Sequence, residues 1–370
     1  MLTNFLNPEI VVYIYMASCA AVLVFNLLYI ASDKSRGKSL EKRSAAIKKE
    51  IQTQLERLKA REEILPVHVL KMAKKLQRLD NLKAYELAYM QLREEEKNEI
   101  MKKYQGGLYE IFLKLVVFYE KRDEIERAYF ARLIESLKIK EGSEKEDALT
   151  DFLLNSVSER NVYIRENAYK ALYSIGNIKL ILLAWKRQEE EGIFHNKKLL
   201  TDGLLTFAGD KRELAETLWR ECENFPEELV LPVMQFIRFS SGDFTERFLE
   251  VMKSGEKTAE IHLEAIRYFR RYVYEPAREV LKEFIKTMNT DEWAYAAMAA
   301  QSLASYPGPD VVDMLKEGLR SINWYVRLNC AEALIVGLKI PKSQLLDVYN
   351  GRDRYAREIL DYVTERIEKR

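Results

Sequence analysis

Cysteine and histidine, the side chains that most often build metal and nucleophilic sites, are scarce in this chain of 370 residues, with three of each. The three cysteines are far apart and fit no disulfide or zinc spacing; they are Cys19, Cys222 and Cys330. No histidine lies in an HExxH pattern, and the sequence lacks a GxxxxGK loop followed by Ser or Thr, a GxGxxG loop and a GxSxG motif. We therefore predict no metal, no cofactor and no enzymatic activity.

Glycine and proline are also scarce, at 14 and 8 residues, and the formal net charge is only +1. Few helix breakers, together with 48% hydrophobic and 32% charged residues, indicate an all-α protein. A net charge close to zero supplies no global field that would attract a polyanion. The composition therefore argues against a nucleic-acid partner.

The sequence has one long apolar run, at residues 10–30, in which only Ser18 and Asn26 are clearly polar. As a helix these 21 residues rise about 31 Å, roughly the thickness of the hydrocarbon core of a bilayer. We predict a single transmembrane helix at residues 10–31, which anchors the protein in the lipid bilayer. The alternatives are a signal peptide, lipid-modified at Cys19 or not, and a buried soluble helix. The absence of Lys and Arg from residues 1–9 and the apolar residues after Cys19 argue against a signal peptide.

The charges that flank this run are asymmetric. Residues 1–9 contain no Lys or Arg, whereas residues 34–49 contain seven against one acid, Glu41. Basic residues close to a span favour the cytoplasmic side. We predict a single-pass protein of the cell membrane, plasma or inner, with a short extracytoplasmic N-terminus at residues 1–9 and a cytoplasmic C-terminal body.

The segment that follows, residues 32–64, is a basic and amphipathic helical stalk. Its apolar stripe recurs every three or four residues, at Leu40, Ser44, Ile47, Ile51, Leu55 and Leu58. The stripe is short and contains a serine, so it supports either a homodimer through the stalk or a helix packed on its own body. Residues 65–140 predict a region of helical hairpins, and the stretch 140–147, KEGSEKED, is typical of a linker. Residues 141–370 then form a further helical region.

This second region repeats itself. Residues 161–172 read NVYIRENAYKAL and residues 323–334 read NWYVRLNCAEAL, and six of the twelve positions are identical. The copies lie 162 residues apart, which is five steps of about 32 residues, and weaker copies occur between them. A fixed period in the low thirties predicts a stack of helix pairs, each of which buries its apolar face against its neighbours.

The last clear unit shows how one step is built. Pro309 and Asp310 open a helix, and Asn323 caps the next helix by accepting from a free backbone N–H. The first helix is predicted to bury Val311, Leu315, Leu319 and Ile322, and the second to bury Val326, Cys330, Ala333, Leu334 and Gly337. Gly337 is also predicted to end its helix in a left-handed conformation.

The pattern resembles the HEAT-repeat family, in particular its short, phycobilisome-lyase-like form. The resemblance covers about residues 146–351, and the residues that carry it are Ile164, Arg165, Ala168, Ala171 and Leu172 in one copy and Val326, Arg327, Cys330, Ala333 and Leu334 in the other. It implies an armadillo-type α-solenoid in which one helix of each pair lines a concave surface. It also implies an architectural role for Arg165 and Arg327, which we expect to bond between repeats. His262-Leu263-Glu264 is not the His-Glu pair that marks HEAT-like metal hydroxylases.

Residues 267–278, RYFRRYVYEPAR, form the best candidate binding patch. Arginines interleave there with aromatic residues, and both kinds of side chain anchor protein interfaces. The candidate partner-binding residues are Arg267, Arg270, Arg271, Tyr272 and Tyr274. The alternatives for this patch are a structural role, in which the aromatic residues are core and the arginines are solvated, and binding of single-stranded nucleic acid.

The sequence therefore predicts a membrane-anchored cytoplasmic HEAT-repeat scaffold or adaptor. Long repeat surfaces without catalytic motifs suit protein partners, for example in an envelope-polysaccharide or signalling assembly. The alternatives are a dimeric single-pass membrane sensor, and an enzyme or nucleic-acid binder built on the same solenoid. The repeat pattern indicates the fold but not the chemistry.

Overall fold

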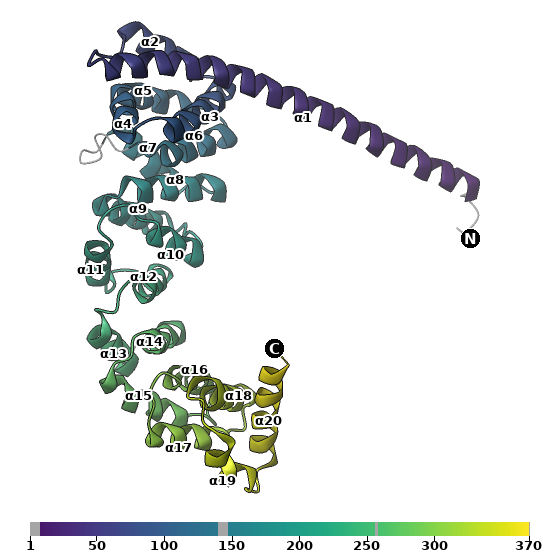
Figure 1. The fold of residues 1–370 in the computed structure, drawn as a ribbon, viewed down its shortest axis with the longest axis vertical. Coiled ribbons are helices and arrows are strands. Elements are labelled where there is room, and N and C mark those ends of the chain that lie inside the picture. Colours follow the sequence, from purple (N-terminus) through teal and green to yellow (C-terminus); the bar gives the residue numbers. More distant parts are fainter. Residues whose placement is uncertain (1–7, 140–146, 256–257, 370) are drawn as a thin grey trace. The chain divides into compact units, whose positions relative to one another are not determined.

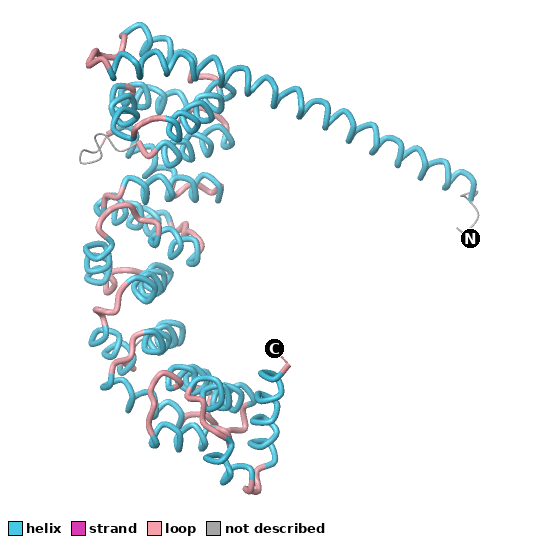
Figure 2. Tube along the Cα trace, in the orientation of Figure 1, coloured by secondary structure: helices cyan, strands magenta, loops and turns pink. Residues whose placement is uncertain are grey.

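The computed structural model describes residues 8–139, 147–255 and 258–369, and every regular element in these ranges is a helix (Figure 2). The chain divides into two compact units, Met1–Leu180 and Ile181–Arg370. The predicted all-α fold, one long apolar helix followed by paired helices, is confirmed. The predicted boundary at 140/141 lies inside the first unit. The linker-like stretch lies outside the described residues except for Asp147, whose side chain caps a helix.

The first unit contains eight described helices (Figure 1). They are α1 (Pro8–Lys59), α2 (Pro66–Lys75), α3 (Leu79–Glu95), α4 (Asn98–Gly107), α5 (Tyr109–Tyr119), α6 (Glu124–Leu137), α7 (Ala148–Ser156) and α8 (Val162–Ile175).

Helix α1 joins the predicted membrane segment and most of the predicted stalk into one helix of 52 residues (Figure 1). From Val12 onward it contains a stretch of residues that is long and apolar enough to cross a membrane. None of that apolar stretch is buried against the rest of the described chain. The second part of α1 packs against α3 and α4. The helix therefore runs through the predicted division at 31/32 without a break, and the first buried side chain that the structure describes along it is that of Ser44.

The stalk stripe is buried within its own chain. Ser44, Ile47, Ile51 and Leu55 are all buried, and α1 lies against α3 along this part. Ion pairs flank the contact, from Lys48 to Glu95 at 2.6 Å and from Lys59 to Glu96 at 2.9 Å. Ion pairs as exposed as these contribute little to stability. Burial of the apolar stripe is therefore the main interaction that holds α1 against the unit. Of the two alternatives for the stripe, packing on its own body is the one observed.

The second unit stacks helices in two rows. Its described helices are α9 (Ile178–Glu191), in which the boundary falls, α10 (Lys197–Leu205), α11 (Lys211–Glu221), α12 (Glu227–Ser240), α13 (Thr245–Lys253), α14 (Ala259–Arg271), α15 (Glu275–Lys286), α16 (Trp293–Leu303), α17 (Pro309–Gly318), α18 (Trp324–Glu332), α19 (Leu346–Tyr349) and α20 (Arg354–Glu368), with a π-helix, η1 (Ala333–Gly337), and a 3-10 helix, η2 (Lys342–Leu345), between α18 and α19. The even row consists of α10, α12, α14, α16, α18 and α20, each in contact with the next. The odd row consists of α11, α13, α15 and α17, which pack against one side of the even row (Figure 1).

The last repeat follows the prediction in most of its core but departs from it at two residues. Val311, Leu315, Leu319, Val326, Cys330, Ala333 and Leu334 are buried. Ile322, however, is 79% exposed, because α17 ends at Gly318 and the helical spacing no longer applies beyond it. Both predictions for Gly337 are also wrong: the residue is exposed, and the left-handed residue is Lys339, with φ 53°. A Cβ at Gly337 would lie 2.5 Å from Ala304 Cβ, so this glycine permits close packing.

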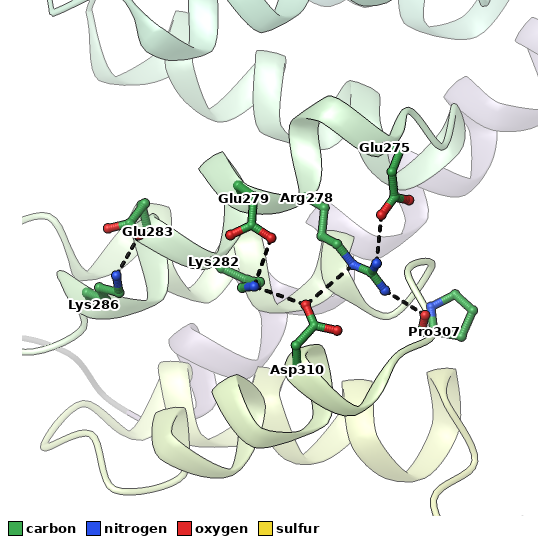
Figure 3. A network of polar contacts seen from close by, with 8 residues as sticks. All are labelled: Glu275, Arg278, Glu279, Lys282, Glu283, Lys286, Pro307 and Asp310. Carbon is green, nitrogen blue, oxygen red and sulfur yellow. Dashed lines mark hydrogen bonds and ion pairs between the residues drawn. The ribbon is translucent and has the colours of Figure 1, made fainter.

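A polar network connects α15 to α17 in the odd row (Figure 3). Asp310, in the first turn of α17, accepts from Lys282 Nζ at 2.9 Å and lies 3.7 Å from Arg278 Nε, while Arg278 also donates to the carbonyl of Pro307 at 2.6 Å. The hydrogen bond from Lys282 is the main cause that lowers the pKa of Asp310 below its usual 3.8, although partial burial opposes it.

Replacing Asp310 by Asn is expected to lower the free energy of unfolding at pH 7 by about 1 kcal/mol or less, because the carboxylate is 41% exposed and screened by solvent. A lowered folded pKa gives stability that is complete above the unfolded pKa and lost as the pH falls through the folded pKa. Thermal melting should therefore separate D310N from wild type more at pH 7 than at pH 3. D313N is the control, since Asp313 is exposed on the same helix and forms no ion pair within the described residues. A difference that grows on acidification would contradict the assignment.

A candidate binding surface on the even row

The even row carries two groups of polar contacts, and the first is built around a buried carboxylate. Glu264 on α14 is 0% exposed and forms ion pairs with Arg238 on α12 and with Arg267, whose Nη1 lies 3.2 Å from Glu264 Oε2. A buried carboxylate without partners would be costly, so the two arginines are part of the packing of α12 on α14. Arg267, a predicted partner-binding residue, is therefore held in place by Glu264.

The next contacts run across three helices. Arg270 Nη1, at the end of α14, donates to Gln301 Oε1 on α16 at 3.1 Å. Gln301 Nε2 donates to Asn329 Oδ1 on α18 at 2.6 Å, and Asn329 Nδ2 donates to the carbonyl of Tyr325 at 2.8 Å. Each amide is oriented by its neighbour, while Arg270 itself is exposed. Its guanidinium retains donors for a ligand because arginine has five N–H groups.

These residues line a groove of about 380 Å³ over the C-terminal halves of α14, α16, α18 and α20. Arg270, Gln301 and Asn329 contribute one wall, and the ion pair between Glu332 and Arg366 contributes another. Small and aliphatic residues form the remainder: Ala304, Ala333, Val336, Gly337 and Ile367. A groove that combines fixed amides, both signs of charge and an apolar floor is suited to a peptide segment with polar and apolar side chains.

The other residues of the predicted patch lie outside this groove. Arg271 is exposed, with its guanidinium carbon 5.8 Å from the ring centroids of both Phe239 and Tyr272. Tyr272 packs against Gly242, where a Cβ would approach its ring to 2.8 Å. The backbone N–H of Tyr274 donates to Tyr306 Oη at 3.1 Å. Of the predicted patch, the structure brings only Arg270 into the groove.

The repeat residues have local partners. The side chains of Asn161 and Asn323 accept from the backbone N–H groups of Tyr163 at 2.9 Å and Tyr325 at 2.8 Å, as helix caps do. Ala171, Leu172, Ala333 and Leu334 are buried.

Within the described residues, the two repeat arginines form their side-chain hydrogen bonds inside their own repeats and not, as we had expected, between repeats; Arg327 contacts a neighbouring helix only by a cation–π contact, with its guanidinium carbon 5.4 Å from the ring centroid of Tyr355 on α20. Arg165 donates to the carbonyls of Glu159 at 2.7 Å and Arg160 at 2.9 Å. Arg327 donates to the carbonyls of Ser321 at 2.6 Å and Ile322 at 3.1 Å. Each arginine therefore donates to backbone carbonyl groups in the loop that precedes its own helix.

The sequence reasoning missed most of the groove, although one signal was present. Gln301 lies 31 residues after Arg270, and the same spacing separates Glu332 from Gln301, so one polar position recurs in three successive repeats. Arg366 and Asn329 fall outside this spacing and are brought in by packing alone. Among the described residues no group of three or more His, Cys, Asp or Glu side chains could hold a metal ion.

No protein-family model matches the chain, and no curated protein matches it. Among solved structures it is similar to human deoxyhypusine hydroxylase in complex with glycerol, at 16% identity and a TM-score of 0.28, over 82% of this chain and 96% of that one. It is also similar to an engineered protein, at 15% identity and a TM-score of 0.35, over 81% of this chain and 89% of that one.

Both identities lie below 25% and both TM-scores below 0.5, so these likenesses indicate no function for this chain. The prediction that the chain is not an enzyme needs correction in this light, because one of the similar structures is an enzyme. The absence of known motifs does not by itself exclude catalysis, because one fold can host many functions.

Proposed function

We propose that the protein is a membrane-tethered helical-repeat scaffold that holds a protein partner on the even row of its second unit. The observation that carries the proposal is the contrast along α1. Its apolar stretch is wholly exposed, whereas Ile47, Ile51 and Leu55 further along the same helix are buried. An exposed apolar surface of that extent is expected to be buried away from water by a partner or a membrane, and the hydrocarbon core of a bilayer matches its length.

The orientation in this proposal places the body in the cytoplasm. Seven basic residues follow the apolar run within residues 34–49, and none precedes it. A bilayer tether confines the groove to a thin layer beside the membrane, which raises the effective concentration of any partner that is also bound there. The partner is then a membrane-bound protein, or one recruited to the membrane, with a peptide segment that fits the groove.

A stalk-mediated dimeric sensor has less support. A dimer through the stalk would use the stripe of α1, but its residues at Ser44, Ile47, Ile51 and Leu55 are already covered by α3 and α4. A homodimer would have to use other residues of α1, or its apolar stretch within the bilayer.

Replacing Arg270 and Arg271 by Glu is expected to reduce partner capture by about tenfold or more. Reversing the charge of Arg270 removes its exposed donors and adds a second carboxylate to a groove that Glu332 already lines. The full chain is purified in mild detergent from its native cells, and the proteins that accompany it are quantified by mass spectrometry.

The matched control reverses two exposed cations on the odd row, Lys211→Glu and Arg212→Glu on α11. It changes the net charge by the same amount away from the groove. Thermal melting of both variants shows whether the fold is retained. Recovery of the same partners at the same level with R270E/R271E as with the control would remove the even row as the capture surface.

A further inference from the structure

A second pocket, in the first unit, is lined by three cations and, among the residues that the structure describes, by no acidic residue. It has a volume of about 570 Å³ and lies between α3, α4 and the end of α6. Arg93 on α3, Lys102 on α4 and Lys138 at the end of α6 contribute three positive charges. The volume lies within the usual range for small-ligand sites.

The wall between these cations is fixed by neutral groups. Gln105 accepts from Tyr89 Oη at 2.9 Å and donates through Nε2 to the carbonyl of Leu137 at 2.7 Å. Desolvation raises the pKa of Tyr89 to about 12, so its phenol stays neutral at physiological pH. Tyr109 is anchored by donating to Asp147. Among the described lining residues, the pocket is therefore held in shape by neutral groups, with no carboxylate or phenolate that would repel an anion.

The three cations differ in how they are engaged. Lys102 pairs with the exposed Glu99 at 3.2 Å. Arg93 and Lys138 form no ion pair with any residue that the structure describes, and Lys138 is held in the left-handed conformation with φ 52°. Like charges that converge on one cavity repel one another, and an anion bound between them would remove that cost.

We infer that this pocket binds a phosphate group, carried either by a soluble small molecule or by a lipid headgroup. A phosphomonoester carries a charge of about −1.5 to −2 at pH 7 and three acceptor oxygens, which suits three cations better than a single carboxylate does. Arg93 offers the planar fork that binds phosphate oxygens in pairs, and the two lysines offer point charges.

The test measures binding to the full chain in detergent by isothermal titration calorimetry. The probes are inorganic pyrophosphate, adenosine triphosphate and dioctanoyl phosphatidic acid. The variant R93Q/K138Q is expected to weaken binding of the probe by more than about tenfold, since it removes two charge-assisted contacts. The single variant R93Q, which leaves the turn at Lys138 untouched, should weaken it in the same direction if the double variant folds poorly.

The control K71Q/K74Q removes two exposed lysines of α2, outside the pocket, and should bind as wild type does. Binding of pyrophosphate or the nucleotide assigns the phosphate to a soluble molecule, and binding of phosphatidic acid alone assigns it to a lipid. Failure of all three probes to bind wild type would overturn the inference. Equal weakening by the control and by R93Q/K138Q would overturn it too, because the attraction would then be a property of the whole surface.

Discussion

The variant A20R/L23R is expected to leave the membrane fraction. Both residues lie near the middle of the apolar run and are exposed on α1. An arginine at the centre of a spanning helix costs about 2.5–3.5 kcal/mol on insertion scales, so two cost about 5 kcal/mol or more. That corresponds to more than a thousandfold change in the partition between membrane and water. The measurement is the fraction of full-length protein that stays in the pellet of carbonate-washed membranes.

The control S32R/S35R places the same two charges at the same spacing on α1, just beyond the predicted span, where basic residues are already frequent. It should remain in the pellet. Wild-type protein that is soluble without detergent would contradict the tether. So would equal retention of A20R/L23R and the control, since the apolar run would then not be the attachment.

Features set by neighbours along one helix were predictable from the sequence. Asn161 and Asn323 precede apolar helices and cap them, and Ala171, Leu172, Ala333 and Leu334 recur in the copies and are buried. Caps and buried faces depend on spacings of two to four residues, which are readable without tertiary structure.

Features set by tertiary packing were not predictable in this way. Ile322 continues the spacing of α17 beyond the helix end, and only the fold shows that the chain has already turned. Arg165 and Arg327 are recognisable as repeat positions, but their partner carbonyls lie in loops whose geometry no period encodes. The groove joins α14, α16, α18 and α20. Its contacts span about 30 residues each, beyond the range of helical periodicity.

Replacing Val326 and Leu334 by Asp is expected to unfold the C-terminal repeats. Both side chains are 0% exposed. Each change removes a buried aliphatic side chain, worth about 2–5 kcal/mol, and adds the cost of a buried polar or charged group. Together they approach the whole stability of an ordinary domain, about 5–15 kcal/mol. Thermal melting followed by circular dichroism should show an early loss of helix, and hydrogen exchange should place it in α16 to α20, because repeats depend on their nearest neighbours.

The control I322D decides between the stripe predicted from spacing and the core observed in the fold. It introduces the same carboxylate into the same repeat, at a residue that the periodicity places on the buried face and that the structure leaves 79% exposed. A surface substitution of this kind changes stability by about 0.5 kcal/mol or less, so I322D should melt with wild type. Should I322D instead melt early alongside V326D/L334D, Ile322 would belong to the core, and the turn between α17 and α18 would differ from the one described.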